Sequence, residues 1–500
     1  MRRQTRGAAK KVGGTEYGVK RFVRVVLALA LVAAAADAQT PDRSKPPKPG
    51  TPPQLRLAPI QHETLTNGLQ VLVLEKHQVP LVQIDLVIRA GAVNDPRGKA
   101  GRASMTADML TQGAGSRNAL EIADAVDFLG AQLDASAGMH TSGVDLFTPL
   151  SKLDSALALM SDVVLRPTFP QAELERRVKD RLTSLLQWRD DPSRLNSVMF
   201  SRTLFGDDHP YGVPLVGDEA SIRGLTVDDV KAFYTAYFHP NNAVLIVVGD
   251  VSKDMIIPQI EKAFGTWKDA PVPTVGLSEP KQVSERTVTL IDKPGAAQSE
   301  ISIGRIGVQR KTDDYYAIVV MNTILGGSFT SRLNNNIREV HGYAYGAYSW
   351  FDFRVMPGPF IATAAVQTAV TDKALGEFMK ELTNILKPVS EAEVERAKNY
   401  VALGYPSEFQ TVGEIAGKLD QLVAYGLPDD TFNNFISRIL SVTKRDVERV
   451  ARKYIDPSKM AVVICGDRRQ IESGVREMNL GPIRLMTADD VFAKTLVPGK

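Results

Sequence analysis

The chain has 500 residues, of which 44% are apolar and 23% are charged, so its composition is that of a globular protein too long for one ordinary hydrophobic core. Its 60 Lys and Arg nearly balance its 57 Asp and Glu, which gives no reason to expect a nucleic-acid partner or an anionic membrane surface. The single cysteine, Cys465, excludes an internal disulfide. It lies in the apolar run 461–465, which predicts a buried strand.

Residues 1–38 show the pattern of a signal peptide. A basic stretch ending at Arg24 precedes the apolar run 25–36, and the small-residue pattern Ala36-Asp37-Ala38 follows, so cleavage before Gln39 is expected. The apolar run is shorter than the ~20 residues of a spanning helix, although a membrane anchor stays open as an alternative. We therefore expect a periplasmic or secreted protein, either in solution or associated with a membrane.

Two Pro-rich stretches divide the rest of the chain. Residues 39–56 are expected to form an extended tether, and residues 266–286 to link two halves of similar length. The halves are predicted to be an N-terminal domain over residues 57–265 and a C-terminal domain over residues 287–485. Residues 486–500 form a tail for which the sequence predicts no structure.

The first half begins with strand patterns and continues with helical ones. A turn signal at 66–68 lies before the alternating run 69–73, and a second alternating run covers 82–88. We expect these two runs to pair as antiparallel strands. Apolar residues at helical spacing over 122–129 and 153–164 then predict two helices.

The second half opens in the same way and repeats the first weakly. Strands are predicted around 288–290 and 301–303, and a buried helix over 315–325. At a constant offset of 217, residues 225–250 match residues 442–467 in a capped helix, a Pro-containing turn and an apolar strand that ends in Gly-Asp.

A second, shorter match pairs residues 172–176 with 392–396. The two matches between the halves predict a duplicated domain. The fold class is therefore α+β, with two homologous domains that each have a mostly antiparallel sheet and helices packed on one face.

Several short motifs together resemble the pitrilysin/insulinase family of zinc metallopeptidases, the inverzincins, and within it the bacterial processing-peptidase-like subunits. The resemblance runs from about residue 57 to 467 and depends on the order of the motifs. They are Leu65-Thr66-Asn67-Gly68-Leu69, Gly91-Ala92, Lys99-Ala100-Gly101, Arg166-Pro167-Thr168-Phe169, His209-Pro210-Tyr211-Gly212, Ser331-Arg332-Leu333, Arg338-Glu339, Gly342 and Ala344-Tyr345.

The family's zinc helix has the motif H-x-x-E-H, whose histidines bind zinc and whose Glu activates the metal-bound water. The matching positions of this chain are Ser104 and Asp108 for the histidines and Ala107 for the Glu. A further Glu ligand falls near Ser184, within residues 181–186, where there is no carboxylate. The resemblance thus implies a degenerate zinc site and no metal in this chain.

The resemblance also implies a surviving substrate-binding pair. In the family, an Arg and a Tyr of the C-terminal half reach the substrate at the zinc site, and they match Arg338 and Tyr345. An Arg can hold a peptide carbonyl or carboxylate with a fork of donors, and a Tyr hydroxyl can donate to an oxyanion. Tyr343 is an alternative to Tyr345, and a surface salt bridge and strand packing are the plainer roles for Arg338 and Tyr345.

Three functions follow from the resemblance. The first is a non-catalytic subunit, inactive alone, that supplies Arg338 and Tyr345 to the zinc site of an H-x-x-E-H partner chain acting on short unfolded peptides. The second is a catalytically inert peptide-binding, chaperone or scaffold protein. The third, a self-sufficient metalloendopeptidase, is disfavoured because every expected ligand is missing.

Overall fold

The computed structural model describes residues 50–492. The predicted signal peptide, most of the predicted tether and the last residues of the tail lie outside this range. Residues 50–60 form no helix or strand, and Leu55 and Leu57 pack against the hydrophobic core of the second half. No helix among the described residues is long and apolar enough to cross a membrane.

The first half is built on a six-stranded sheet with the strand order β1-β2-β8-β3-β7-β6. The β2–β8 pair is parallel and the other pairs are antiparallel. The strands are β1 (Gln61–Thr64), β2 (Gln70–Glu75), β3 (Leu81–Ile88), β6 (Gln132–Ala137), β7 (Ser142–Pro149) and β8 (Ala243–Gly249). A small hairpin, β4 (Gly113–Ala114) and β5 (Arg117–Asn118), lies apart from this sheet.

The prediction that the runs 69–73 and 82–88 pair with each other is wrong. They form β2 and β3, but β8 lies between them. The turn at 66–68, where Gly68 has a φ of 88°, instead joins β2 to β1. Alternation fixes which face of a strand is buried and not which strand lies beside it, and β8, buried along its whole length, takes the place between them.

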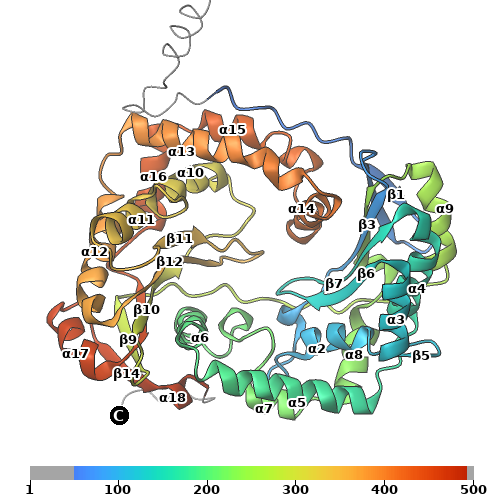
Figure 1. Ribbon diagram of the computed structural model, residues 1–500, viewed down its shortest axis with the longest axis horizontal. Helices are drawn as coiled ribbons and strands as arrows, with labels where there is room; N and C mark the ends of the chain where they lie inside the picture. The colour runs from blue at the N-terminus through green and yellow to red at the C-terminus, as the bar shows by residue number, and fades with distance from the viewer. Residues whose placement is uncertain (1–49, 493–500) are drawn as a thin grey trace, which may run out of the picture. The chain divides into compact units, whose positions relative to one another are not determined.

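Five helices pack with this sheet and build the first core. Figure 1 shows α3, α4, α8 and α9 on the same side of the sheet. The predicted helices at 122–129 and 153–164 lie within α3 and α4. The five are α2 (Arg102–Leu110), α3 (Ala119–Leu129), α4 (Leu153–Leu165), α8 (Val227–Tyr237) and α9 (Lys253–Phe264).

The second half repeats this layout in the strand order β11-β12-β10-β13-β9-β14. Strand β13 corresponds to β8 and lies between β9 and β10, as β8 lies between β2 and β3. The strands are β9 (Thr287–Asp292), β10 (Gln298–Ile306), β11 (Tyr348–Phe351), β12 (Pro359–Gln367), β13 (Ala461–Gly466) and β14 (Ile483–Thr487).

The predicted repeat is confirmed at the level of single caps. Thr226 begins α8 and Thr443 begins α16 (Lys444–Tyr454), and each forms a capping box with an Asp three residues later. Each helix leads to the buried strand at the expected offset. The duplicated α+β fold class is therefore correct.

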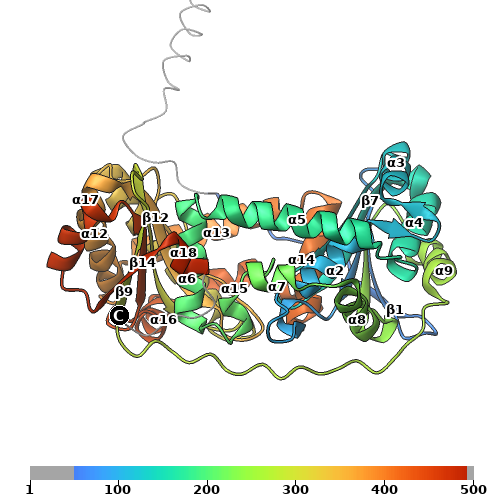
Figure 2. The ribbon, with the colours of Figure 1, turned by 90° about the horizontal axis from the view of Figure 1, so that it is seen from below.

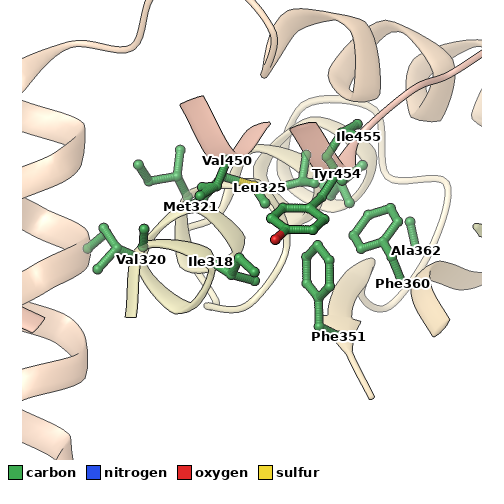
Figure 3. Close-up of a cluster of buried hydrophobic side chains, with 14 of the residues drawn as sticks. Ile318, Val320, Met321, Leu325, Phe351, Phe360, Ala362, Val450, Tyr454 and Ile455 are labelled. Carbon is green, nitrogen blue, oxygen red and sulfur yellow. The ribbon is translucent and has the colours of Figure 1, made fainter. Parts of the chain in front are cut away.

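Helix α10 (Tyr315–Leu325) covers the range predicted for a buried helix and forms the second core with α16. In Figure 3, the rings of Phe351 and Phe360 from β11 and β12 lie beside Tyr454. The Tyr454 hydroxyl donates to Asp314, which precedes α10, at 2.7 Å. The other helices are α11 (Arg332–Asn334), α12 (Thr371–Asn384), α13 (Glu391–Gly404), α15 (Phe435–Ser441), α17 (Arg468–Glu477) and α18 (Ala488–Phe492).

The two halves exchange one helix each. Helix α6 (Pro192–Phe205), which follows α5 (Gln171–Trp188) and belongs to the first half by sequence, packs on β10 and β13. Helix α14 (Val412–Tyr425) of the second half packs on β3 and β8. Each sheet thus has its own helices on one face and a helix from the other half on the second.

Short helix α7 (Glu219–Arg223) follows α6 and contacts α5. Residues 265–286, close to the predicted linker, run from α9 to β9 without helix or strand (Figure 2).

Candidate functional site

Helix α2 contains the positions that match the zinc motif, and its start is held firmly. The Asp95 carboxylate accepts hydrogen bonds from the backbone N–H of Gly101 at 2.9 Å and of Ala103 at 2.8 Å. Gly101 has a φ of 88°, and a Cβ there would lie 2.4 Å from the carbonyl oxygen of Val216. Only glycine fits this position, so the loop around Val216 lies directly against the start of α2.

The predicted zinc-site positions on α2 are engaged in ordinary packing. The Ser104 hydroxyl lies within hydrogen-bond reach of the carbonyl oxygens of Gly101 and Leu215, at 3.1 and 2.9 Å. Ala107 is fully buried. Ser184 lies on α5, where it is exposed and donates to its own helix at Asp180.

Asp108, the second histidine position, binds an arginine. Nη2 of Arg181 donates to Oδ2 of Asp108 at 2.7 Å, and Nη1 donates to the carbonyl oxygens of Gly101 and Val216 at 3.2 and 3.4 Å. The Arg181 side chain is 10% exposed and that of Asp108 36%. A guanidinium from α5 thus provides the positive charge beside α2. Sequence reasoning missed this residue, although an arginine one turn before Ser184 was visible.

These residues do not fit a zinc ion. Zinc sites in proteins use imidazole, thiolate and carboxylate ligands, whereas this group offers one carboxylate, a hydroxyl already bonded to carbonyl oxygens, and a fixed cation. The guanidinium would repel a divalent ion at the same carboxylate. Within residues 50–492, no group of three or more His, Cys, Asp or Glu side chains could hold a metal ion.

Arg338 and Tyr345 come together in the second half. Arg338 lies on the π-helix Asn335–Val340 that continues α11. Its guanidinium carbon lies 5.2 Å from the ring centre of Tyr345 and 4.4 Å from that of Phe329. Both distances are within the range of cation–π contacts. Tyr343 instead stacks on His341, with ring centres 4.9 Å apart, so Tyr345 is the tyrosine that contacts Arg338.

A buried asparagine holds the two segments that flank Arg338. Asn334 is fully buried; its amide donates to the carbonyl oxygen of Phe329 at 2.6 Å, and its side-chain oxygen accepts from the N–H of Ala347 at 3.2 Å. One side chain therefore fixes the loop that carries Phe329 and the segment that carries Tyr345. The motif comparison gave no signal for either Asn334 or Phe329.

The two groups of residues are separate. Across the described part of the chain, no hydrogen bond, ion pair or ring contact joins the Asp108–Arg181 pair to Arg338 or Tyr345. The His209-Pro210-Tyr211 motif is a junction instead. The Tyr211 hydroxyl is bonded to His140 Nε2 at 2.7 Å and accepts from the N–H of Met356 at 3.2 Å, which ties the first half to the second.

Comparison with known proteins identifies the family. The model "Insulinase (Peptidase family M16)" matches residues 70–206, and the model "Peptidase M16 inactive domain" matches residues 224–401. The chain belongs to the insulinase family of peptidases. The two matches together span more than half of the sequence. The first match lies within the first half of the duplicated fold, and the second runs from α8 at the end of the first half into the second half.

Bacterial members of the insulinase family resemble the chain over most of their length. An uncharacterised zinc protease of Mycobacterium leprae is 27% identical over 70% of this chain and 78% of its own. The zinc protease PqqE of Helicobacter pylori is 25% identical over 81% of this chain and 92% of its own.

Solved structures agree with the fold. The peptidase M16 inactive domain from Pseudomonas fluorescens superposes with a TM-score of 0.76 at 26% identity, over 81% of this chain and 98% of that one. A protease from Helicobacter pylori also gives a TM-score of 0.76, at 22% identity, over 82% and 100% of the two chains. The family match, this likeness to an inactive domain and the residues on α2 support a non-catalytic member of the insulinase family.

Proposed function

We propose that this chain is the non-catalytic subunit of a two-chain zinc peptidase and supplies Arg338 and Tyr345 to a zinc site on a partner of the same family. One contrast carries the proposal. The Arg338–Tyr345 pair is assembled and open to solvent, with Tyr345 86% exposed, whereas Arg181 and Asp108 close the matching position on α2.

The geometry around Arg338 suits a peptide backbone. Phe329 and Tyr345 each lie within cation–π distance of its guanidinium, and rings in such contacts lie over a face of the guanidinium plane. Its Nε lies 3.5 Å from Oε1 of the adjacent Glu339, so the N–H groups of the two Nη atoms are the donors left for a carbonyl or carboxylate. The Tyr345 hydroxyl forms no hydrogen bond with any described residue, so it is available to donate to an oxyanion. In this proposal the partner supplies the zinc-activated water.

The test is a peptidase assay with an internally quenched peptide. The mature chain would be assayed alone and mixed with the product of an adjacent H-x-x-E-H gene. We expect cleavage only in the mixture. Arg338→Ala and Tyr345→Phe should each lower kcat/KM of the mixture about 100-fold, the usual effect of removing one transition-state donor. Arg445→Ala, at an exposed arginine on α16, is the matched control and should leave the rate unchanged.

Other outcomes would favour the other functions. Cleavage by this chain alone, with one zinc per chain by elemental analysis, would mean a self-sufficient peptidase. Full activity of the partner without this chain, together with peptide binding by this chain, would mean an inert peptide-binding protein. Equal activity of the mixture with Arg338→Ala and with Arg445→Ala would refute the role of Arg338.

We also propose export to the periplasm, because residues 1–38 carry a basic stretch, an apolar run and a small-residue cleavage pattern. Mass spectrometry of the purified native protein should find an N-terminus at Gln39. An intact Met1 on protein recovered from the cytoplasmic fraction would refute export.

A further inference from the structure

A pocket lined by both polar and apolar side chains adjoins the Arg338–Tyr345 pair. It has a volume of about 480 Å³ and lies between α6 and the edge of the second sheet. Its helix wall carries small polar residues such as Ser193 and Ser197, its floor includes Glu300 and Thr363, and its far end is aromatic. Tyr345 belongs to this pocket and to the Arg338 contact alike.

The pocket exists because α6 covers only part of the sheet. The helix packs on β10 and β13, where Asn196 donates to the carbonyl oxygens of Glu300 and Val463, both at 2.9 Å. Strands β12 and β11 continue the sheet beyond this contact. The uncovered strip ends at the edge strand β11, where Tyr348 is 45% and Trp350 42% exposed.

Glu300 is the carboxylate on the pocket floor, and it has no protein partner. Among residues 50–492, no side chain forms a hydrogen bond or ion pair with its carboxylate. Burial raises the pKa of Glu300, and the nearby Asp191 charge raises it further, which means that the charged form lacks a compensating cation. Lys293, in the segment between β9 and β10, is bound to Asp190 at 2.7 Å.

The strand register places Glu300 one row away from the aromatic end of the pocket. Glu300 pairs with Ala365 on β12, and the next inward-facing row joins Ser302, Thr363 and Tyr348. Because neighbouring strands lie ~4.8 Å apart, β10 and β11 are about 10 Å apart across β12. A carboxylate and aromatic side chains rising from these two strands leave room for one cationic group between them.

We propose that this pocket binds the cationic side chain of a lysine or arginine in an extended peptide, with Glu300 as the counter-ion and Tyr345, Tyr348 and Trp350 as the aromatic wall. Aromatic faces and a carboxylate together select for an ammonium or guanidinium group. The inference rests on the proposed function in one respect, because the bound peptide is the one whose backbone Arg338 holds. It adds the substrate class: peptides with a basic residue close to the segment held by Arg338.

The test measures peptide binding by the chain alone, without a partner or zinc. Fluorescein-labelled, N-acetylated ten-residue peptides of Ala, Ser and Gly would carry one Lys, one Gln or one Glu at the same position. We expect the Lys peptide to bind about tenfold more tightly by fluorescence anisotropy. Glu300→Gln should reduce this preference to below twofold, and Glu300→Lys should shift it to a peptide that carries Glu instead. Glu477→Gln, at an exposed carboxylate on α17, is the matched control.

A further peptide with a free N-terminus and no lysine separates the two sources of an ammonium group. Stronger binding of this peptide than of the acetylated Lys peptide would overturn the side-chain proposal in favour of a terminal amine. A Lys preference that Glu300→Gln leaves intact would overturn the pocket. Since neither result depends on the partner, the pocket can fail while the Arg338-dependent cleavage holds, and the cleavage can fail while the pocket holds.

Discussion

Replacing Asp420 by Asn tests how α14 is held against the first sheet. Burial raises the pKa of Asp420 to about 8, with the charges of Asp85 and Asp145 adding to the effect. Burial likewise raises the pKa of Asp85 to about 7, with the Asp145 charge beside it, and that of Asp145 to about 6, with the Asp134 charge beside it. Asp145 lies opposite both Asp85 and Asp134 in the strand register.

These carboxylates have few partners. Gln83 donates to Asp85, and Oδ1 of Asp420 is buried without a hydrogen bond to any described residue. The cluster therefore binds protons more tightly in the folded protein than in the unfolded chain between about pH 4 and pH 8. Stability consequently falls as the pH rises through this window.

The magnitude follows from the shift at Asp420. If Asp420 titrated alone, a rise of its pKa from 3.8 to about 8 would lower the free energy of unfolding by about 6 kcal/mol at high pH, at 1.36 kcal/mol per pKa unit. The carboxylates share their protons, so one substitution recovers only part of this free energy. We expect Asp420→Asn to raise the free energy of unfolding by ~2 kcal/mol or more at pH 8.5 and to change it by less than ~1 kcal/mol at pH 5.

Urea unfolding followed by tryptophan fluorescence would measure the difference at both pH values. Hydrogen exchange of the α14 amides would report local opening of the same contact. Asp124→Asn, at an exposed carboxylate on α3, is the control and should have no effect at either pH. Equal effects of Asp420→Asn at pH 5 and 8.5, or a loss of stability at pH 8.5, would refute the reasoning.

Four further substitutions and reactions test other parts of the structure. Arg181→Met leaves Asp108 without its cation. Because solvent screens that carboxylate, we expect the free energy of unfolding to fall by only ~1 kcal/mol in thermal unfolding. We also expect no zinc uptake by elemental analysis, and one bound zinc would contradict our account of α2. Burial opposes ionisation of Asp314, but hydrogen bonds to its carboxylate lower its pKa to about 2. Asp314→Asn should therefore lower the free energy of unfolding by ~2 kcal/mol at pH 7 in urea unfolding. This loss of stability should disappear as the pH falls from 4 to 2. Cys465 is fully buried, and burial raises its pKa to about 12. A thiol reagent should therefore label it only in denaturant, and rapid labelling of the folded protein at pH 7 would contradict the burial. Asn334→Ala should lower kcat/KM in the mixed peptidase assay, because both segments around Arg338 lose their anchor, and an unchanged rate would show that Asn334 does not position the pair.

Features that depend on neighbouring residues in the chain were predictable. The caps at Thr226 and Thr443, the helix over 315–325 and the buried strand around Cys465 follow from local patterns of polar and apolar residues. The duplication and the family resemblance also came from the order of short motifs. They located Arg338 and Tyr345, and they showed that α2 lacks histidine.

The residues around the site were less predictable, because the contacts that matter join distant segments. Phe329 and Asn334 do not belong to the matched motifs, yet they flank and hold the Arg338–Tyr345 pair. Arg181 lies far from Asp108 in the sequence, and only the packing of α5 on α2 brings its guanidinium to that carboxylate.

The sequence by itself thus determined the caps, the helix over 315–325, the buried strand around Cys465 and the repeat, because periodicity and capping act over a few residues. It also shows that α2 lacks the two histidines and the Glu of the zinc motif. Tertiary structure alone decided that β8 separates β2 from β3, that α6 and α14 exchange between the halves, and that Asp420 joins the carboxylates of the first sheet. Alternation in a strand specifies its buried face but leaves its neighbour open. The neighbour is chosen by how the whole chain buries its apolar surface.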